Sequence, residues 1–303
     1  MKLGMITNFW AFAGMPMEES LERVAALGFK YVDLYGRLHG DPRSVGEGEY
    51  GKVRQKLDEL DLKASDFLSI TAGRAVVGNA GSSDPEEYSK CMEYMKKSID
   101  YAKATDCKHA LVLGGVLEDG LSREESWANA IKFLKECAAY AEEKGVYLAL
   151  ESLQDEDVPV NLVRTIDDMV RMIEEVESEF LLANIDLGHV FLRTCNHKPD
   201  ELRKLANRVI HVHITDNDGT FDSNCMLDGR GKAPIRRYLE QLREYGIEEA
   251  ARRCGDEAVA AIEVGRPGDE LVTGLEEGSL DPDELTKTCM DYLLKEVPFL
   301  ELE

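Results

Sequence analysis

Residues 146–186 read VYLALESLQDEDVPVNLVRTIDDMVRMIEEVESEFLLANID, and this stretch contains the unit from which the fold can be predicted. It begins with one short apolar run, 146–151, and ends with another, 181–186. Between them, Thr165 and Asp168 form the capping signal of a helix whose following residues are apolar at helical spacing. Two strands joined by a helix predict a parallel β–α–β unit.

The same alternation of short apolar runs and longer amphipathic segments extends over the rest of the chain. The predicted strands cover 2–7, 31–35, 62–70, 110–113, 146–151, 181–186, 209–213 and 258–263. The predicted helices cover 17–28, a segment around 53–60, 85–102, 122–145, a segment from 165, a short one from 199, 235–245 and 285–294. Ser122 with Glu125 repeats the capping signal. Eight β–α units in strict alternation predict a parallel sheet.

Closure of this sheet into a barrel is the economical solution, because a barrel leaves no unpaired edge strand. An open doubly wound sheet is the alternative. Against it, the first strand–helix junction lacks the GxGxxG and GxxxxGK[ST] phosphate-binding patterns. The sequence has no linker that would divide it, so we expect residues 1–303 to form one α/β domain, a (β/α)8 barrel.

The composition argues against several classes of function. Acidic residues number 59 against 36 basic ones, and the net charge of −23 repels phosphodiester backbones, so nucleic acid is a poor partner. No apolar run reaches the roughly 18 residues of a membrane span, and the N-terminus lacks a signal-peptide pattern, so we expect a cytoplasmic protein without a membrane partner. The seven cysteines contain no CxxC pair, which fits reduced thiols better than disulfides.

Polar residues able to bind a metal end four consecutive apolar runs: Glu151, Asp186, His213 and Glu263. The carboxyl ends of barrel strands meet at one mouth, so these side chains are expected to converge there. Any one of them has an ordinary alternative, since a carboxylate at a strand end can cap the next helix or meet water. The coincidence of four donors favours a metal site. His211 shares a strand face with His213, and we assign it to the core.

The donor set indicates which metal to expect. Three carboxylates and one imidazole form a mostly hard, oxygen-rich set that suits one divalent ion, with Mn2+ favoured over Mg2+ or Co2+. A structural zinc site would be richer in thiolates, although Zn2+ could replace the native ion during purification.

Four short motifs carry a resemblance to a known family: Leu150-Glu151, Asp186-Leu-Gly-His189, His211-Val-His213-Ile-Thr-Asp216 and Ile262-Glu263. Over essentially its whole length, the chain resembles the sugar phosphate isomerase/epimerase family of the xylose isomerase-like TIM-barrel superfamily. The resemblance implies a single divalent metal ion bound by Glu151, Asp186, His213 and Glu263. It also implies that Glu151 and Glu263 act as catalytic acid and base, and that His189 contacts the substrate.

The sequence departs from the ketose 3-epimerases of this family in two places. Those enzymes carry an Asn-Arg-aromatic-Glu stretch after the fifth-strand glutamate, where this chain has Ser-Leu-Gln-Asp-Glu-Asp at 152–157. Their substrate-binding arginine, six residues past the metal histidine, is matched here by Gly219. Both differences weaken a 3-epimerase assignment and leave the expected metal ligands untouched.

The expected chemistry is proton transfer at a carbon next to a carbonyl in a small sugar, ketose or polyol-ketone. A Lewis-acid metal stabilises the enediolate formed on deprotonation, and a neighbouring carboxylate takes the proton. Return of a proton to the opposite face gives an epimer, and its return to the adjacent carbon gives an aldose–ketose isomer. One metal-bound enediolate serves both outcomes, so the sequence does not decide between isomerase and epimerase.

The candidate substrate-binding residues, besides His189, are Trp10, Phe12 and Arg266. Trp10 and Phe12 follow the first strand, where an aromatic ring either covers a sugar face or packs beneath a loop. Arg266 follows the last strand, and it either holds an anionic group of the substrate or balances nearby acids.

Other functions use the same scaffold. A metal-dependent lyase or dehydratase of inositol-type substrates would share the enediolate, and a non-catalytic relative would bind a sugar without turnover. An apurinic-site endonuclease needs three zinc ions and additional histidines, but 69–71, 114–115 and 228–230 contain none, and the net charge opposes DNA binding. The acidic surface does not forbid assembly into a homo-oligomer.

Overall fold

A computed structural model describes residues 1–36, 47–69, 78–153, 160–192, 200–266 and 268–303. Eight parallel strands follow one another in sequence order and close into a barrel, with β8 paired to β1. The strands are β1 Lys2–Ile6, β2 Tyr31–Tyr35, β3 Lys63–Leu68, β4 His109–Leu113, β5 Tyr147–Glu151, β6 Leu181–Asp186, β7 Val209–Ile214 and β8 Val259–Ile262. The predicted (β/α)8 barrel is confirmed, and the open-sheet alternative is wrong.

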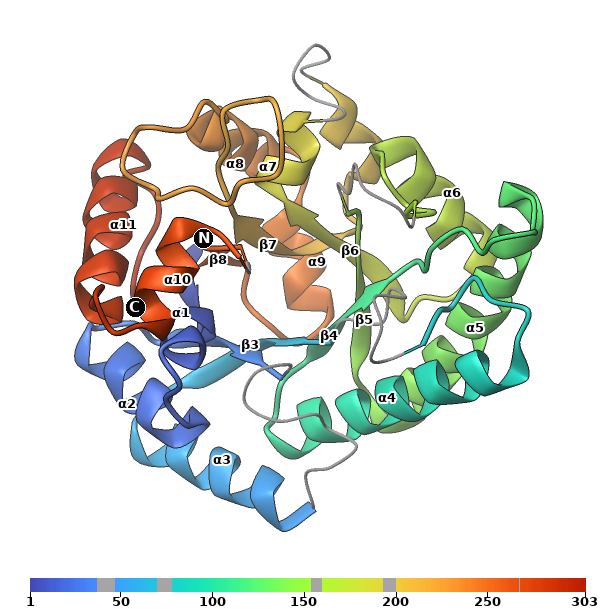
Figure 1. Ribbon diagram of the computed structural model, residues 1–303, viewed down its shortest axis with the longest axis horizontal. Helices are drawn as coiled ribbons and strands as arrows, with labels where there is room; N and C mark the ends of the chain where they lie inside the picture. The colour runs from blue at the N-terminus through green and yellow to red at the C-terminus, as the bar shows by residue number, and fades with distance from the viewer. Residues whose placement is uncertain (37–46, 70–77, 154–159, 193–199, 267) are drawn as a thin grey trace.

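The helices surround the strands, as Figure 1 shows. Those that match predicted helical segments are α2 Met17–Ala26, α3 Glu47–Glu59, α4 Pro85–Ala104, α5 Arg123–Lys144, α6 Ile166–Val176, α8 Ile235–Glu244 and α11 Pro282–Glu296. Both predicted capping boxes form, Ser122 with Glu125 before α5 and Thr165 with Asp168 before α6. Gly145 ends α5 in the left-handed conformation, at φ 67°, which a residue without Cβ adopts readily.

Among the described residues, the structure contains four further helices that the sequence does not predict: α1 Asn8–Phe12, α7 Leu187–Val190, α9 Ile247–Arg253 and α10 Glu270–Glu276. They are 4 to 7 residues long, too short to display a helical repeat in the sequence. Three of them, α1, α7 and α10, follow strands at the carboxyl end of the barrel. The short helix expected from 199 is a 3-10 helix, η2 Glu201–Leu205, and residues 193–199 lie outside the described residues.

The core has an apolar shell and a partly polar interior. Side chains between the strands and the helices form the shell, and they include the fully buried Phe133 of α5. A smaller apolar cluster lies at the ends of β1 to β4. Buried polar residues also occur on the strands: Asp33, Asp66, His109, Asn184 and His211. Branched apolar residues ordinarily fill such a barrel, so these polar groups require partners inside it.

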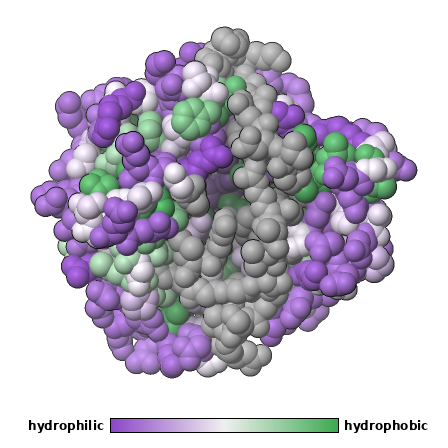
Figure 2. Space-filling model, viewed as in Figure 1, coloured by the Kyte–Doolittle hydropathy of each residue, from purple (hydrophilic) through white to green (hydrophobic). Residues whose placement is uncertain are grey.

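Where Figure 2 is coloured by hydropathy, the surface is mostly hydrophilic, as the net charge of −23 implies. No helix within the described ranges combines the length and apolar character needed to cross a membrane. Large apolar side chains that do reach the surface include Phe221, which is 50% exposed. Phe221 lies on the loop that follows β7, and the next residue of this loop, Asp222, belongs to the site described below.

Candidate metal and active site

The barrel register brings the four predicted metal ligands to one end of the barrel. Glu151 is the last residue of β5, and Asp186, the last residue of β6, pairs in register with His213 of β7. Glu263 follows β8 directly, and its N–H donates to the carbonyl of Ile214. The four residues therefore lie at the carboxyl ends of consecutive strands, where barrel active sites form.

His213 contacts two of the carboxylates in this cluster. Its Nδ1 atom lies 2.9 Å from Oε2 of Glu151 and 3.1 Å from Oε2 of Glu263. Candidate ligand atoms of Asp186, His213 and Glu263 all lie within 4.8 Å of one another, and those of Glu151, Asp186 and His189 are equally close. The Glu263 side chain is 20% exposed and the other three ligands are almost fully buried, so the cluster opens to solvent beside Glu263.

The hydrogen bonds of Asp186 indicate that this donor set fits a metal ion. Its Oδ1 accepts hydrogen bonds from the His189 N–H at 2.8 Å and from the Thr215 hydroxyl at 2.5 Å. Its Oδ2 is buried and has no hydrogen-bond partner among the described residues. A buried carboxylate oxygen without a donor is unfavourable unless it is protonated or binds a cation. Three carboxylates and one imidazole therefore form a set of ligands that suits a divalent ion.

The ionisable groups of the cluster shift one another's pKa. Burial raises the pKa of Asp186 to about 7, and the carboxylates of Glu151 and Glu263 add to the rise. Burial lowers the pKa of His213, but Glu151 and Glu263 outweigh this effect and hold that pKa well above its ordinary value. Protons therefore supply positive charge to the clustered carboxylates, and a metal ion that binds here must displace them.

A second set of polar contacts joins the segments that follow β6, β7 and β8. Nε2 of His189, in α7, lies 3.1 Å from Oδ2 of Asp222, on the loop after β7. Arg266, after β8, donates to the carbonyl of Asp222 at 3.1 Å. On its other side, Nδ1 of His189 lies 3.6 Å from Oε1 of Glu151 and 3.6 Å from Oδ1 of Asp186. His189 therefore stands between Asp222 and the candidate metal ligands.

A cavity of about 160 Å³ lies at the carboxyl end of the barrel, and the polar groups in its wall include Glu151, His189, His213, Asp222, Glu263 and Arg266. Three of the predicted substrate-binding residues, Phe12, His189 and Arg266, belong to its wall. The expectation for Trp10 is wrong, because this side chain is fully buried and its indole N–H donates to Oδ1 of Asp283 at 2.7 Å, in α11. Residues two apart on a helix point in different directions, so α1 sends Phe12 to the cavity and Trp10 into the packing against α11.

Two further residues, Asn184 and Asp222, belong to this site although neither ends a strand nor stands in one of the sequence motifs. Asn184 donates from Nδ2 to Oε2 of Glu151, and the same nitrogen lies 3.1 Å from Nδ1 of His213. Its position two residues before Asp186 is the signal that could have identified it, because such residues share one face of a strand. Asp222 lies on an irregular loop, where no periodic pattern indicates the direction of a side chain.

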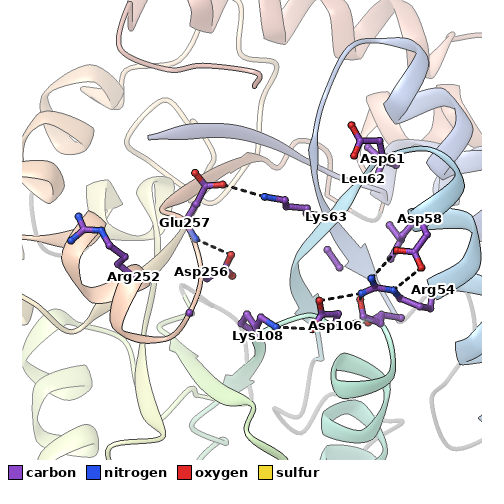
Figure 3. A pocket seen from close by; sticks show the side chains of 14 residues that line it. Arg54, Asp58, Asp61, Leu62, Lys63, Asp106, Lys108, Arg252, Asp256 and Glu257 are labelled. Carbon is purple, nitrogen blue, oxygen red and sulfur yellow. Dashed lines mark hydrogen bonds and ion pairs between the residues drawn. The ribbon is translucent and has the colours of Figure 1, made fainter.

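A larger cavity of about 650 Å³ lies at the opposite end of the barrel, where β3, β4 and β8 begin (Figure 3). Many of its charged side chains pair with one another: Arg54 with Asp58 and Asp106, and Lys63 with Glu257. This amino-terminal end of a barrel generally contributes to stability, whereas catalytic groups gather at the carboxyl end. The chemistry of the side chains, and not the size of the cavity, therefore identifies the candidate active site.

Comparisons with known proteins agree with the barrel fold. A family model described as xylose isomerase-like TIM barrel matches residues 21–259. The fructoselysine 3-epimerase of Shigella flexneri is 23% identical over 249 residues, which are 82% of this chain and 87% of that protein. A structure of IOLI protein with a bound zinc atom has a TM-score of 0.74 and 18% identity, and covers 98% of both chains. D-psicose 3-epimerase with D-fructose present has a TM-score of 0.71 and 16% identity, and covers 97% of this chain and 99% of that one. The chain is therefore an enzyme of the xylose isomerase-like TIM-barrel family, as its sequence predicts.

Proposed function

We propose that this protein is a metal-dependent isomerase or epimerase of a small sugar, ketose or polyol-ketone, acting through an enediolate. The observation that carries the proposal is the position of two carboxylates, Glu151 and Glu263, which lie 2.9 Å and 3.1 Å from the same nitrogen of His213. Both carboxylates also line one cavity. The fructoselysine and D-psicose 3-epimerases to which the chain is similar support this class of reaction.

The ion would be held by the four residues that end consecutive strands: Glu151, Asp186, His213 and Glu263. We propose Mn2+ as the native ion, because oxygen-rich ligands suit it, and we expect Mg2+, Co2+ or Zn2+ to occupy the same ligands. The zinc atom in the IOLI structure is consistent with such exchange. When bound, the ion would stabilise the negative charge that develops on substrate oxygens during deprotonation.

The chain's own carboxylates would move the proton. Asn184 donates to Oε2 of Glu151, which leaves Oε1 of Glu151 to take a proton from the substrate carbon. Glu263 has the more exposed side chain of the two, and it would return a proton to the substrate. Return to the same carbon from the other face gives an epimer, whereas return to the adjacent carbon gives an isomer.

Three residues of the cavity wall would contact the substrate. Nδ1 of His189 lies 3.6 Å from Oε1 of Glu151, so His189 would hydrogen-bond a substrate hydroxyl next to the carbon that loses its proton. Phe12 would cover an apolar face of the sugar. The guanidinium of Arg266 would donate to hydroxyl or anionic groups. Trp10 would take no part, because it is buried against α11.

A substrate screen in D2O tests this proposal. The full chain is incubated with Mn2+ and a panel of ketoses, aldoses, inosones and their phosphates, and the reactions are followed by NMR. We expect at least one substrate to be converted with incorporation of solvent deuterium at a carbon-bound position. Turnover without exchange would favour hydride transfer, and a product lighter by one water would indicate a dehydratase. A metal-loaded protein that turns over none of these compounds would contradict the proposal.

A further inference from the structure

The interior of the barrel beside the candidate metal ligands contains a buried, paired carboxylate. Asp33 of β2 and His211 of β7 are both fully buried, and Oδ2 of Asp33 lies 2.8 Å from Nε2 of His211. Oδ1 of Asp33 accepts a hydrogen bond from the Ser65 hydroxyl at 2.5 Å. Asp33 is therefore a buried carboxylate that His211 and Ser65 hold in place inside the barrel.

The same carboxylate also lies next to the far side of His213. Nε2 of His213 is 3.7 Å from Oδ2 of Asp33, and this nitrogen has no hydrogen-bond partner among the described residues. Nδ1 of the same ring faces Glu151 and Glu263. One nitrogen of His213 is thus directed toward the candidate metal ligands, and the other is directed toward Asp33.

The two ring nitrogens have different roles when an imidazole binds a metal. A neutral imidazole carries one hydrogen, and the nitrogen without it is the one that donates a lone pair to the ion. With Nδ1 as the ligand atom, the hydrogen is on Nε2, inside the barrel, where it requires an acceptor. A carboxylate oxygen has two lone pairs, so Oδ2 of Asp33 is able to accept from both His211 and His213.

We propose that Asp33 is a positioning residue of the metal site: its carboxylate accepts the Nε2–H of His213 and so directs the Nδ1 lone pair toward the ion. The inference rests on the proposed metal site and extends it across the barrel, from β5–β8 to β2. A carboxylate behind a metal-bound histidine fixes the orientation of the ring and raises its basicity, and loss of such a partner weakens metal binding by about 10- to 100-fold.

The competing interpretation is that Asp33 only satisfies His211 and stabilises the fold. Asp66 of β3 and His109 of β4 form a second buried pair of the same kind. Asp66 therefore serves as a matched control for a carboxylate that only stabilises the fold. Oδ1 of Asp66 lies 2.8 Å from Nδ1 of His109, and both residues are 1% exposed. In the part of the chain that the structure describes, Asp66 has no hydrogen bond or ion pair with a candidate metal ligand.

Metal titration of the full chain separates the two interpretations. Metal-free wild type, Asp33→Asn and Asp66→Asn are titrated with Mn2+ by calorimetry, and thermal melting followed by circular dichroism shows whether each protein is folded. We expect the Kd for Mn2+ to rise by about 10-fold or more in Asp33→Asn and to stay within about twofold of wild type in Asp66→Asn. An unchanged Kd in Asp33→Asn, or an equal rise in both variants, would overturn the inference. A wild-type protein that binds neither Mn2+, Co2+ nor Zn2+ would instead refute the proposed metal site, and the inference with it.

A second measurement decides the matter if Asp33→Asn does not fold. Nitrogen-15 NMR of the wild-type protein loaded with diamagnetic Zn2+ reports which ring nitrogen of each histidine carries hydrogen, and comparison with His213→Ala assigns the signals of His213. We expect hydrogen on Nε2 and the metal on Nδ1. Hydrogen on Nδ1 of His213 would overturn the inference whatever the behaviour of the variants.

Discussion

Asp222 contacts His189 on the side away from the candidate metal ligands, with its Oδ2 atom 3.1 Å from Nε2 of the imidazole. A carboxylate accepts hydrogen bonds and does not donate them, so Nε2 carries the hydrogen and Nδ1 is left to face the cavity. Arg266 fixes the same stretch of chain by donating to the Asp222 carbonyl. The loop after β7 therefore determines which nitrogen of His189 would meet a substrate.

The variant Asp222→Asn should lower kcat/KM by about 10- to 100-fold, because a hydrogen bond to a charged group contributes about 1.5–3 kcal/mol. The Kd for Mn2+ should stay unchanged, since Asp222 is not a candidate ligand. Steady-state kinetics and calorimetric titration measure the two effects. Asp218→Asn is the control on the same loop, because Asp218 is exposed and its side chain accepts hydrogen bonds from Thr220. Full activity in Asp222→Asn would mean that other contacts orient His189.

The variants Glu151→Gln and Glu263→Gln should each lower kcat by about 100-fold or more. An amide keeps the size of the side chain but does not take up the proton, and acid–base catalysis contributes about 10²- to 10⁴-fold. Exchange of solvent deuterium into the substrate is the measurement. Glu257→Gln serves as the control, because Glu257 pairs with Lys63 at the opposite end of the barrel. Wild-type exchange in either active-site variant would remove that residue from the proposed mechanism.

The four candidate ligands could be located from the sequence because consecutive strands of a parallel barrel are neighbours and their carboxyl ends lie at the same end. Glu151 and Asp186 end apolar runs, and the parallel register alone brings such ends to one rim. Asp33 could not be found in this way. It meets His211, 178 positions away in sequence, only because the closed barrel brings side chains of the non-adjacent strands β2 and β7 together in its interior. A contact across the interior depends on how the side chains of non-adjacent strands pack together. A local sequence pattern does not indicate this packing.

The residues outside the strands are predicted less well, for a different physical reason. Trp10 and Phe12 both follow the first strand and both lie in the five-residue helix α1. The turn of this helix buries Trp10 completely and places Phe12 in the cavity wall. A helix of that length has no measurable period in a sequence. Asp222 is held by contacts with His189 and Arg266, which lie in segments after two other strands, and not by its neighbours in the chain.

Binding of Mn2+ should weaken as the pH is lowered. Burial holds the pKa of Asp186 at about 7, so below that pH the carboxyl is protonated and an incoming ion must displace the proton. The raised pKa of His213 acts in the same direction. One displaced proton corresponds to a Kd that rises about tenfold per pH unit below about 7, and a second makes the rise steeper. Calorimetric titrations from about pH 5.5 to 8 measure this, with the double variant Asp186→Asn/His213→Ala as the protein that should bind no ion. A constant Kd over that range would contradict the assignment of these ligands.

The substitution Gly231→Ala should destabilise the loop that carries Asp222. Asp216 is buried, and its Oδ1 accepts hydrogen bonds from the N–H groups of Asn217 and Ala233, both at 2.8 Å, which ties the end of the loop to its start. A Cβ on Gly231 would lie 1.9–2.2 Å from the carboxyl atoms of Asp216, closer than such atoms approach, so the loop has to shift. We expect the free energy of unfolding to fall by about 1–3 kcal/mol.

Urea denaturation and kinetics on the same samples test this expectation, and α3 provides the matched substitution. Gly51 lies inside that helix, where an added Cβ meets no atom within 4 Å, so Gly51→Ala should raise the free energy of unfolding by about 0.5–1 kcal/mol and leave activity unchanged. In Gly231→Ala, kcat/KM should fall together with stability, because displacement of the loop moves Asp222 away from His189. Lost stability with full kcat/KM would show that the carboxylate of Asp216 yields to the new methyl group without moving Asp222.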